Sequence, residues 1–319
     1  MERSQRPSRD IYQEVTDEIV TALEQGVAPW VRPWKTGRLL PGANPIFPVN
    51  IRGTSYRGVN VLLLWAVAQN NAYTSNLWLT FRQAQEMGGT VRRGERSTPV
   101  VLWRFLRVAK ATSGDAEEGS GSKTIPIIRH YNVFNLDQTE GVEIPMAEGV
   151  DKGRDESDAW VDGLIESTGA RIVHGGDRAV YCGGTIDKIN LPPRPSFNSR
   201  ESYYATLWHE LTHWTGHEAR LARDLTGRFG SQAYAAEELV AELGSAFCCA
   251  HCELKTEHLQ HPEYIGTWIQ VLKDDKRAIF TASAKAKAAA EFLIPAMKPE
   301  EEAEDQTQSE QPTTTMVAG

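Results

Sequence analysis

The stretch HELTH, residues 209–213, places two histidines four residues apart, with a glutamate directly after the first. On a helix, residues four apart lie one turn apart on the same face, so His209 and His213 point the same way. Two such imidazoles can both reach one Zn²⁺ at about 2.0–2.1 Å, while Glu210 is near enough to take a proton from a water that the metal activates. This HExxH spacing is typical of zinc metallopeptidases.

The residues around the motif favour a helix over about 199–215. Asn198 is a suitable N-cap, with Glu201 three residues later, and Gly216 is a suitable C-terminal stop. Because HExxH supplies only two ligands, a metal site needs a third. One class of zincins uses a histidine three residues beyond a glycine, but here Ala219 stands three residues beyond Gly216, which disfavours that class.

Three glutamates in the segment YAAEELVAELGSAF are candidates for the third ligand: Glu237, Glu238 and Glu242. Glu238 and Glu242 are four residues apart and share a helix face, so one can bind the metal while the other orients a ligating histidine. We predict Glu238 as the ligand and Glu242 as its support. A solvated acidic face is the alternative, but apolar residues surround the pair, and burying uncompensated carboxylates is costly.

The net charge of −8 is unevenly distributed along the 319 residues. Residues 1–110 contain 15 Lys and Arg against 8 Asp and Glu, and the remainder contains 19 against 34. A basic front half beside an acidic back half suggests a polyanion partner for the front. The acidic back half disfavours a nuclease reading of the HExxH motif, because it would repel the substrate.

Neither the cysteines nor the apolar runs point to a secreted or membrane protein. The motif CCAHC, with Cys248, Cys249 and Cys252, forms neither a disulfide framework nor paired CxxC knuckles, so we predict small apolar residues on a helix. No run reaches the roughly 18 apolar residues of a membrane span, and the start lacks the apolar stretch of a secretory signal. We expect a cytoplasmic location and no membrane partner.

The chain is long enough for two domains of about 100–200 residues each. Apolar periodicity predicts helices at 10–26, at about 59–69 and through TFRQAQEMG, and then strands at about 97–108 and 124–135 joined by a Gly/Ser-rich loop at 112–123. After a break near 147–155, we predict a helix at 157–168, short strands in RIVHG, AVYCG and TIDKINL, and helices through most of 199–295. The predicted fold class is α+β, with domains at 1–150 and 151–297 and a disordered acidic tail at 298–319.

The front half has the two features that hold single-stranded DNA, which are basic groups for the phosphates and aromatic side chains for the bases. Basic residues lie beside aromatic ones in WVRPWK, SYRGVN and LWRFLR, and TVRRGER resembles a basic turn. Trp65 and Trp78 lie in apolar runs and are predicted to be core residues. The predicted DNA-binding residues are Trp30, Trp34, Tyr56, Arg57, Arg92, Arg93 and Arg104.

Taken together, several long motifs resemble the ArdC-type antirestriction proteins of plasmids. YYATLWHELTHWTGHEARLARD and YAAEELVAELGSAF resemble their zincin-like domain, and APWVRPW, YRGVNVLLL, WLTFRQAQEMGGTVRRGERSTPVVLW and YNVFNLDQTEG resemble their single-stranded-DNA-binding domain. The resemblance covers about residues 8–295. It implies protection of incoming conjugative DNA from host restriction, a metal-dependent protease activity, and a protein of the host restriction system as a candidate substrate.

We therefore expect a protein that binds single-stranded DNA without sequence preference and carries a zinc peptidase, with Mn²⁺ or another divalent ion as the alternative metal. Glu210 is the expected general base, Tyr234 or His217 the group that stabilises the oxyanion, and TIDKINLP the edge strand along which a peptide lies. The alternative is a DNA-coating protein whose metal site is structural and catalyses nothing.

Overall fold

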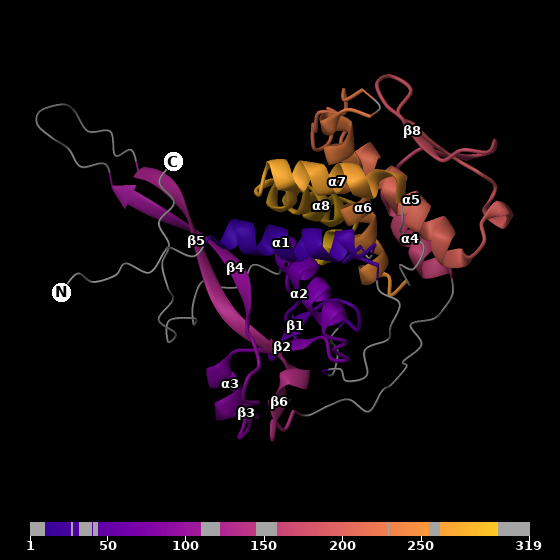
Figure 1. Ribbon diagram of the computed structural model, residues 1–319. Coiled ribbons are helices and arrows are strands. Elements are labelled where there is room, and N and C mark those ends of the chain that lie inside the picture. The colour runs from indigo at the N-terminus through magenta and orange to yellow at the C-terminus, as the bar shows by residue number, and fades with distance from the viewer. Residues whose placement is uncertain are drawn as a thin grey trace, which may run out of the picture.

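The structure is a computed structural model, in which residues 10–26, 28–31, 40, 44–109, 122–144, 158–228, 230–254 and 262–298 are described (Figure 1). Side chains are described for these residues except 103–109, 122–128, 262 and 263. The predicted domain break near 147–155 and the predicted acidic tail beyond residue 298 lie outside the described residues.

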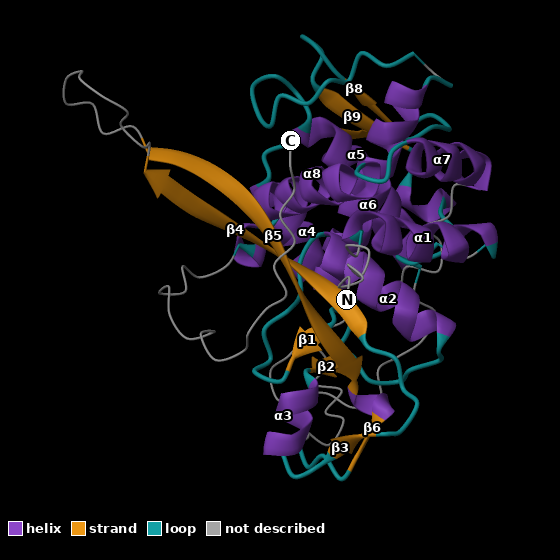
Figure 2. Cartoon of the chain, turned by 60° about the vertical axis from the view of Figure 1, so that its left-hand side comes forward, coloured by secondary structure: helices purple, strands orange, loops and turns teal. Residues whose placement is uncertain are grey.

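The front half consists of three helices and six strands in the described part of the chain (Figure 2). They are α1 (Ile11–Glu24), β1 (Val49–Asn50), α2 (Val59–Asn70), β2 (Leu77–Leu79), α3 (Phe81–Glu86), β3 (Thr90–Val91), β4 (Thr98–Ala109), β5 (Ser122–Asn135) and β6 (Thr139–Glu140). The sheet order is β1-β2-β5-β4, and β3 pairs separately with β6. The predicted antiparallel hairpin is confirmed: β4 and β5 form a long twisted ribbon that projects from the body (Figures 1 and 2).

The back half combines a small sheet with a helical majority, as the α+β prediction requires. Its elements are α4 (Asp158–Ser167), β7 (Ile172–His174), β8 (Val180–Cys182), β9 (Lys188–Leu191), α5 (Arg200–Thr215), α6 (Gln232–His251), α7 (Pro262–Asp274) and α8 (Ala278–Leu293). The three strands are arranged in the order β7-β9-β8, parallel between β7 and β9 and antiparallel between β9 and β8. In the part of the chain that the structure describes, no helix is long and apolar enough to span a bilayer.

The helix that carries both histidines, α5, begins one residue later than its sequence suggests. Ser199 is the N-cap and forms a capping box: its hydroxyl accepts from the N–H of Ser202, and its own N–H donates to the Ser202 hydroxyl, both at 3.0 Å. The prediction of Asn198 paired with Glu201 was therefore wrong, although Gly216 does end the helix. The N-cap differs from the prediction because the Ser202 hydroxyl can accept the hydrogen bond from the N-cap N–H as well as a glutamate carboxylate can.

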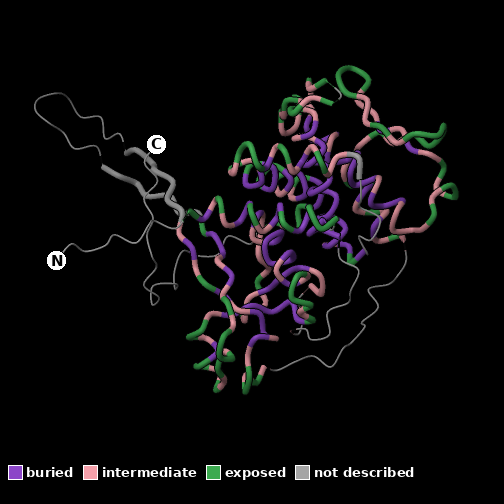
Figure 3. The backbone as a smooth tube through the Cα atoms, in the orientation of Figure 1, coloured by how far each residue is buried: buried purple, intermediate pink, exposed green. Residues whose placement is uncertain are grey.

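One hydrophobic cluster runs through both halves of the molecule. It joins α1 and α2 of the front half to the helices α5–α8, with α6 at its centre (Figure 3). Trp65 and Trp78 are core residues, each 1% exposed, and Cys248 and Cys249 are fully buried, as predicted. Because the front and back halves share this core, either half expressed alone would expose a large apolar surface.

Candidate metal centre

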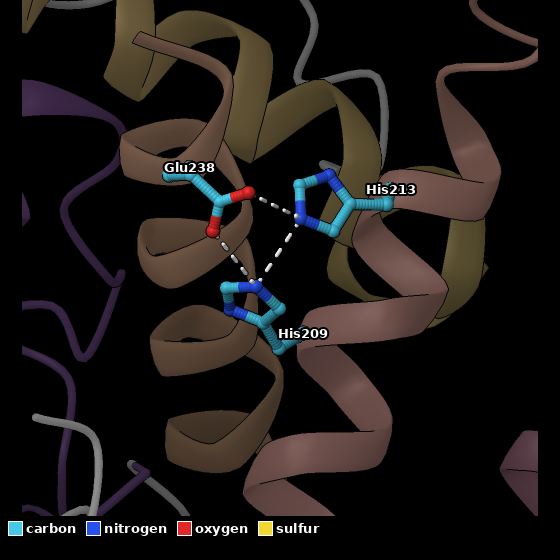
Figure 4. A group of neighbouring side chains, drawn as sticks. All are labelled: His209, His213 and Glu238. Carbon is cyan, nitrogen blue, oxygen red and sulfur yellow. Dashed lines mark hydrogen bonds and ion pairs between the residues drawn. The ribbon is translucent and has the colours of Figure 1, made fainter. Parts of the chain in front are cut away.

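His209 and His213 extend from α5 towards α6 and converge with Glu238 (Figure 4). The two Nε2 atoms are 3.2 Å apart. Oε2 of Glu238 lies 3.5 Å from Nε2 of His209, and Oε1 lies 3.5 Å from Nε2 of His213. The two imidazoles and the predicted carboxylate therefore present three ligand atoms to one point between the helices.

These separations fit a divalent cation held by three protein atoms. Two atoms that are each about 2.05 Å from a tetrahedral zinc lie about 3.3–3.4 Å from one another. The two Nε2 atoms, 3.2 Å apart, are close to that value, and each lies 3.5 Å from a different oxygen of the Glu238 carboxylate, Oε2 for His209 and Oε1 for His213. Within the described residues, this is the group of His, Cys, Asp and Glu side chains whose donor atoms are close enough together to hold a metal.

The nitrogens that face away from the centre each lie beside a carboxylate. Nδ1 of His209 is 3.6 Å from Oε2 of Glu242, and Nδ1 of His213 is 3.3 Å from Oε1 of Glu237. A carboxylate on Nδ1 holds the proton there and leaves the lone pair of Nε2 free for a metal, which is the usual arrangement around ligating histidines. Glu242 lies behind His209 and its carboxylate is fully buried, so this face of α6 is not solvated there.

Glu237, one of the three candidate ligands, pairs with Arg223, which was not among the predicted site residues. The guanidinium of Arg223 forms an ion pair with Glu237 at 2.8 Å and also donates to the carbonyl of Thr212 at 2.6 Å and the hydroxyl of Thr215 at 2.8 Å. Burial raises the pKa of Glu237, but the combined effect of His213 and Arg223 is larger and opposite, so the net shift of the pKa is downward. Arg223 thus keeps the carboxylate behind His213 charged and fixed to α5.

The charges of the centre favour a cation. Burial alone would lower the pKa of His209, but the neighbouring carboxylates of Glu238 and Glu242 outweigh burial and raise it to about 10. Burial would raise the pKa of Glu238, yet His209 and His213 lower it to about 2. The carboxylates therefore stabilise positive charge at this point, whether a proton or a metal ion carries it.

Glu210 lies beside the centre and contacts the edge of the small sheet. Its Oε2 accepts a hydrogen bond of 2.7 Å from the backbone N–H of Tyr181 in β8. The Tyr181 hydroxyl donates to Asp187 at 2.9 Å, and Asp187 pairs with Arg220 at 2.6 Å. This network fixes β8 against α5 and holds the Glu210 carboxylate at the cavity wall.

A cavity of about 480 Å³ opens onto the centre. It is lined by His209, Glu210, His213, Glu237 and Glu238, by Ala179, Val180 and Tyr181 of the β8 region, and by Ala205, Thr206, Asp224, Leu225, Gly227, Ala233, Tyr234 and Tyr264. The prediction that TIDKINLP is the edge strand was wrong. Those residues include β9, which is paired on both sides, whereas the edge strand at the cavity is β8.

Of the two residues proposed to stabilise an oxyanion, Tyr234 lines the cavity and His217 does not. Burial, together with hydrogen bonds to Tyr264 and Glu238, raises the pKa of Tyr234 well above its ordinary value. Its hydroxyl therefore keeps its proton at neutral pH and can donate it in a hydrogen bond. The imidazole of His217 instead lies 3.3 Å from the carbonyl of Gly184 and accepts from the N–H of Ala219.

Trp30 and Tyr56, the two predicted DNA-binding aromatic residues that the structure describes, are not fully exposed. Trp30 is fully buried, so the prediction that bases stack on it was wrong; the surrounding Pro and Gly residues concealed a core position. Tyr56 packs against the hydrophobic core, and burial raises the pKa of its hydroxyl. Trp34 lies outside the described residues. An aromatic residue that the sequence reasoning did not select, Phe81, is 48% exposed.

The predicted basic residues differ in how accessible they are. Arg92 and Arg93 are exposed in the turn after β3, where Arg92 forms an ion pair of 2.8 Å with Glu95. Arg57 donates to the carbonyl of Met297 at 3.4 Å and lies 3.9 Å from Glu291. The side chain of Arg104 lies outside the described side chains.

Two family matches and several relatives agree with this architecture. Residues 9–134 match the N-terminal domain of the anti-restriction factor ArdC, and residues 159–285 match a zincin-like metallopeptidase family. Protein y4eC of Sinorhizobium fredii is 37% identical over 302 residues, covering 92% of this chain and 94% of its own length. Two Escherichia coli proteins named DNA primase TraC are each 34% identical over about 300 residues, but the chain spans only 20% and 27% of their lengths.

Solved structures show the same fold. The Mn(II)-bound structure of the antirestriction protein ArdC from plasmid R388 matches with a TM-score of 0.73 and 37% identity, covering 91% of this chain and 98% of that one. The metal-free structure of the same protein matches with a TM-score of 0.72 and 38% identity, with the same coverage.

Proposed function

The chain belongs to the family of ArdC antirestriction proteins, and we propose that it binds single-stranded DNA through its front half and hydrolyses a peptide bond at the metal centre of its back half. Its role would be to protect incoming conjugative DNA from host restriction. The observation that carries the proposal is the convergence of His209, His213 and Glu238 next to Glu210, on an open cavity.

The donor set fits a resident divalent ion, and the R388 relative has been crystallised with Mn(II). A bound zinc or manganese ion supplies Lewis acidity to a water and to the carbonyl of a substrate. Zinc sites with three protein ligands beside a cavity are usually catalytic, because structural sites are closed by four. This supports a peptidase over a purely structural ion.

The protein's own residues have separate tasks in this reaction. Glu210 would accept the proton of the attacking water and return it to the leaving amine. Tyr234 would donate a hydrogen bond to the developing oxyanion. The outer edge of β8 would pair with the substrate backbone. The N–H of Tyr181 would then either donate its hydrogen bond to the substrate or continue to donate it to Glu210 and hold that carboxylate in place.

Replacing Glu210 with Gln tests the peptidase proposal. The probe is a proteome-derived peptide mixture, incubated with the full chain loaded with Zn²⁺ or Mn²⁺ and analysed by mass spectrometry for new termini. Wild type should cleave, while Glu210→Gln should bind metal normally and lose at least a hundredfold in rate, the typical contribution of a general base. Glu218→Gln, an exposed change outside the cavity, serves as the control.

No cleavage by wild type, or equal cleavage by Glu210→Gln, would contradict the peptidase and leave the alternative of a DNA-coating protein with a structural metal. That alternative has one observation in its favour. One oxygen of the Glu210 carboxylate, Oε2, is already engaged by the N–H of Tyr181.

The DNA-binding part of the proposal is supported by the excess of basic residues over 1–110 and by the lobe formed by α3, β3 and β6 (Figures 1 and 2). There, Arg92, Arg93 and Arg96 are exposed around the turn before β4, and Phe81 is exposed on α3. Arginines can contact phosphates, and a half-exposed phenyl ring offers a face for a base. The TraC relatives are named DNA primases, which is consistent with a nucleic acid partner.

This part is tested with the full chain, because the two halves share a core. A fluorescein-labelled oligo-dT should bind with an affinity that falls steeply with salt. Phe81→Ala should weaken binding by about 1–3 kcal/mol, and Arg93→Ala should reduce the slope against log salt by about one. The matched control is Phe292→Ala, a 40% exposed phenylalanine on α8. Equal weakening by both phenylalanine variants, or binding that is independent of salt, would refute the assignment.

A further inference from the structure

An indole of the front half contacts the carboxylate behind one of the candidate ligands. Nε1 of Trp30 donates to Oε1 of Glu242 over 3.4 Å, although the two residues are 212 positions apart. The other oxygen of this carboxylate, Oε2, lies 3.6 Å from Nδ1 of His209. A continuous line of polar contacts thus runs from the front half, through α6, to the imidazole on α5.

The surroundings of Trp30 fix its ring. The indole packs edge-on against Trp268 of α7, with 5.8 Å between ring centroids. Trp268 is itself held by a 3.0 Å hydrogen bond from its Nε1 to the carbonyl of Ala235 on α6. With Trp30 and Glu242 both fully buried, solvent cannot supply a replacement donor without opening the core.

From these contacts we propose that Trp30 is a positioning residue of the metal centre. The indole N–H fixes the Glu242 carboxylate, and the carboxylate in turn fixes the rotation and tautomer of His209, so that Nε2 faces His213 and Glu238. The inference rests on the proposed metal centre. It adds that the zincin-like half does not contain the complete site, because one of the groups that orient a ligand comes from the front half.

This arrangement links the metal centre to the front half of the protein. Any movement of the segment 28–31 that breaks the contact between Trp30 and Glu242 would weaken metal binding. By thermodynamic reciprocity, a bound metal would disfavour that movement, and the coupling free energy is the same in both directions. Metal occupancy and the conformation of the front half are coupled through this hydrogen bond.

The test compares two buried tryptophans of the front half. Trp30→Phe retains an aromatic ring against Trp268 but removes the donor to Glu242. Trp65→Phe is the matched control: Trp65 is also buried, its Nε1 donates to the carbonyl of Ile46 at 3.0 Å, and its ring packs against Phe247 of α6. Its indole N–H therefore has a partner outside the metal centre.

Zn²⁺ affinity of the full chain would be measured by competition with a chromophoric chelator, and the stability of the metal-free chain by urea unfolding. Both variants should lose stability, but only Trp30→Phe should weaken Zn²⁺ binding, by about 10- to 100-fold. Glu242→Gln should weaken it to a similar extent, and the double variant Trp30→Phe/Glu242→Gln should be no weaker than Glu242→Gln alone.

Wild-type Zn²⁺ affinity in Trp30→Phe, or equal weakening by Trp30→Phe and Trp65→Phe, would overturn the positioning role while leaving the metal centre intact. Additive losses in the double variant would overturn it as well. Failure of the metal centre itself would give a different result. The wild-type chain would then bind no Zn²⁺, or its Zn²⁺ binding would be unchanged in His213→Ala.

Discussion

The helices that carry the candidate ligands meet at a glycine, which makes their spacing sensitive to one methyl group. A Cβ added to Gly244 of α6 would lie 2.6 Å from both Cγ2 and Oγ1 of Thr212 on α5. Carbon atoms in contact prefer about 3.5–4.0 Å, so Gly244→Ala requires about 1 Å of movement. Thr212 cannot easily yield, because it is fully buried and its hydroxyl donates to the carbonyl of Trp208 at 2.8 Å.

Two opposing effects set the change in stability. Alanine is favoured over glycine in a helix by about 1 kcal/mol, whereas overpacking a close-packed core costs about 1–3 kcal/mol. We expect Gly244→Ala to lose about 1 kcal/mol of unfolding free energy in the metal-free chain. Separation of α5 from α6 would also lengthen the two 3.5 Å distances between Glu238 and the imidazoles, so Zn²⁺ affinity should fall at least tenfold, which is about 1.4 kcal/mol.

The assays are urea unfolding in the presence of a chelator and Zn²⁺ titration. Gly163→Ala is the matched control, because Gly163 lies within α4 and a Cβ there meets no atom within 4 Å. It should gain about 0.5–1 kcal/mol and bind Zn²⁺ as wild type does. If Gly244→Ala is stabilised like Gly163→Ala and keeps wild-type Zn²⁺ affinity, the reasoning about helix spacing is refuted.

Two further predictions concern the charges around the centre. With a pKa of about 10 in the metal-free chain, His209 holds a proton below that pH. Zn²⁺ binding at pH 7 should therefore release about one proton, and Zn²⁺ affinity should rise about tenfold per pH unit up to pH 10. Calorimetry in buffers of different ionisation enthalpy measures the number of protons released. If no proton is released, the pairing of His209 with Glu238 and Glu242 is contradicted. Arg223→Leu should cost about 3–5 kcal/mol of unfolding free energy, because it leaves the Glu237 carboxylate buried without its guanidinium. Adding Glu237→Gln should recover part of that loss, and a strictly additive double variant would argue against the ion pair.

Local spacing predicted the parts of the centre that lie within one helix turn. The four-residue interval between His209 and His213 fixes their common face, and the interval between Glu238 and Glu242 fixes a second face, so both pairs could be placed without a structure. The helices themselves follow from apolar periodicity and end signals, as in α1, which was predicted over 10–26 and spans Ile11–Glu24 with Asp10 as its N-cap. Those features depend only on neighbouring residues.

Contacts between segments that are distant in the chain could not be predicted from the sequence. The role of Arg223 depends on how α5 and α6 cross, and the burial of Trp30 depends on α7 packing over a Pro/Gly-containing segment that resembles a surface loop. Strand order is also a non-local property, which is why a strand with a favourable pattern, β9, proved to be central and β8 to be the edge. An exposed aromatic such as Phe81 lacks any periodic signal that distinguishes it from a core residue.

The central claim is that His209, His213 and Glu238 hold one divalent ion. Anomalous diffraction at the zinc edge, from crystals of the full chain grown with Zn²⁺, tests it directly. We predict a single strong peak between α5 and α6, about 2.0–2.2 Å from Nε2 of both histidines and from a carboxylate oxygen of Glu238. A peak bound by other residues, or no peak at this point in zinc-saturated crystals, would contradict the account.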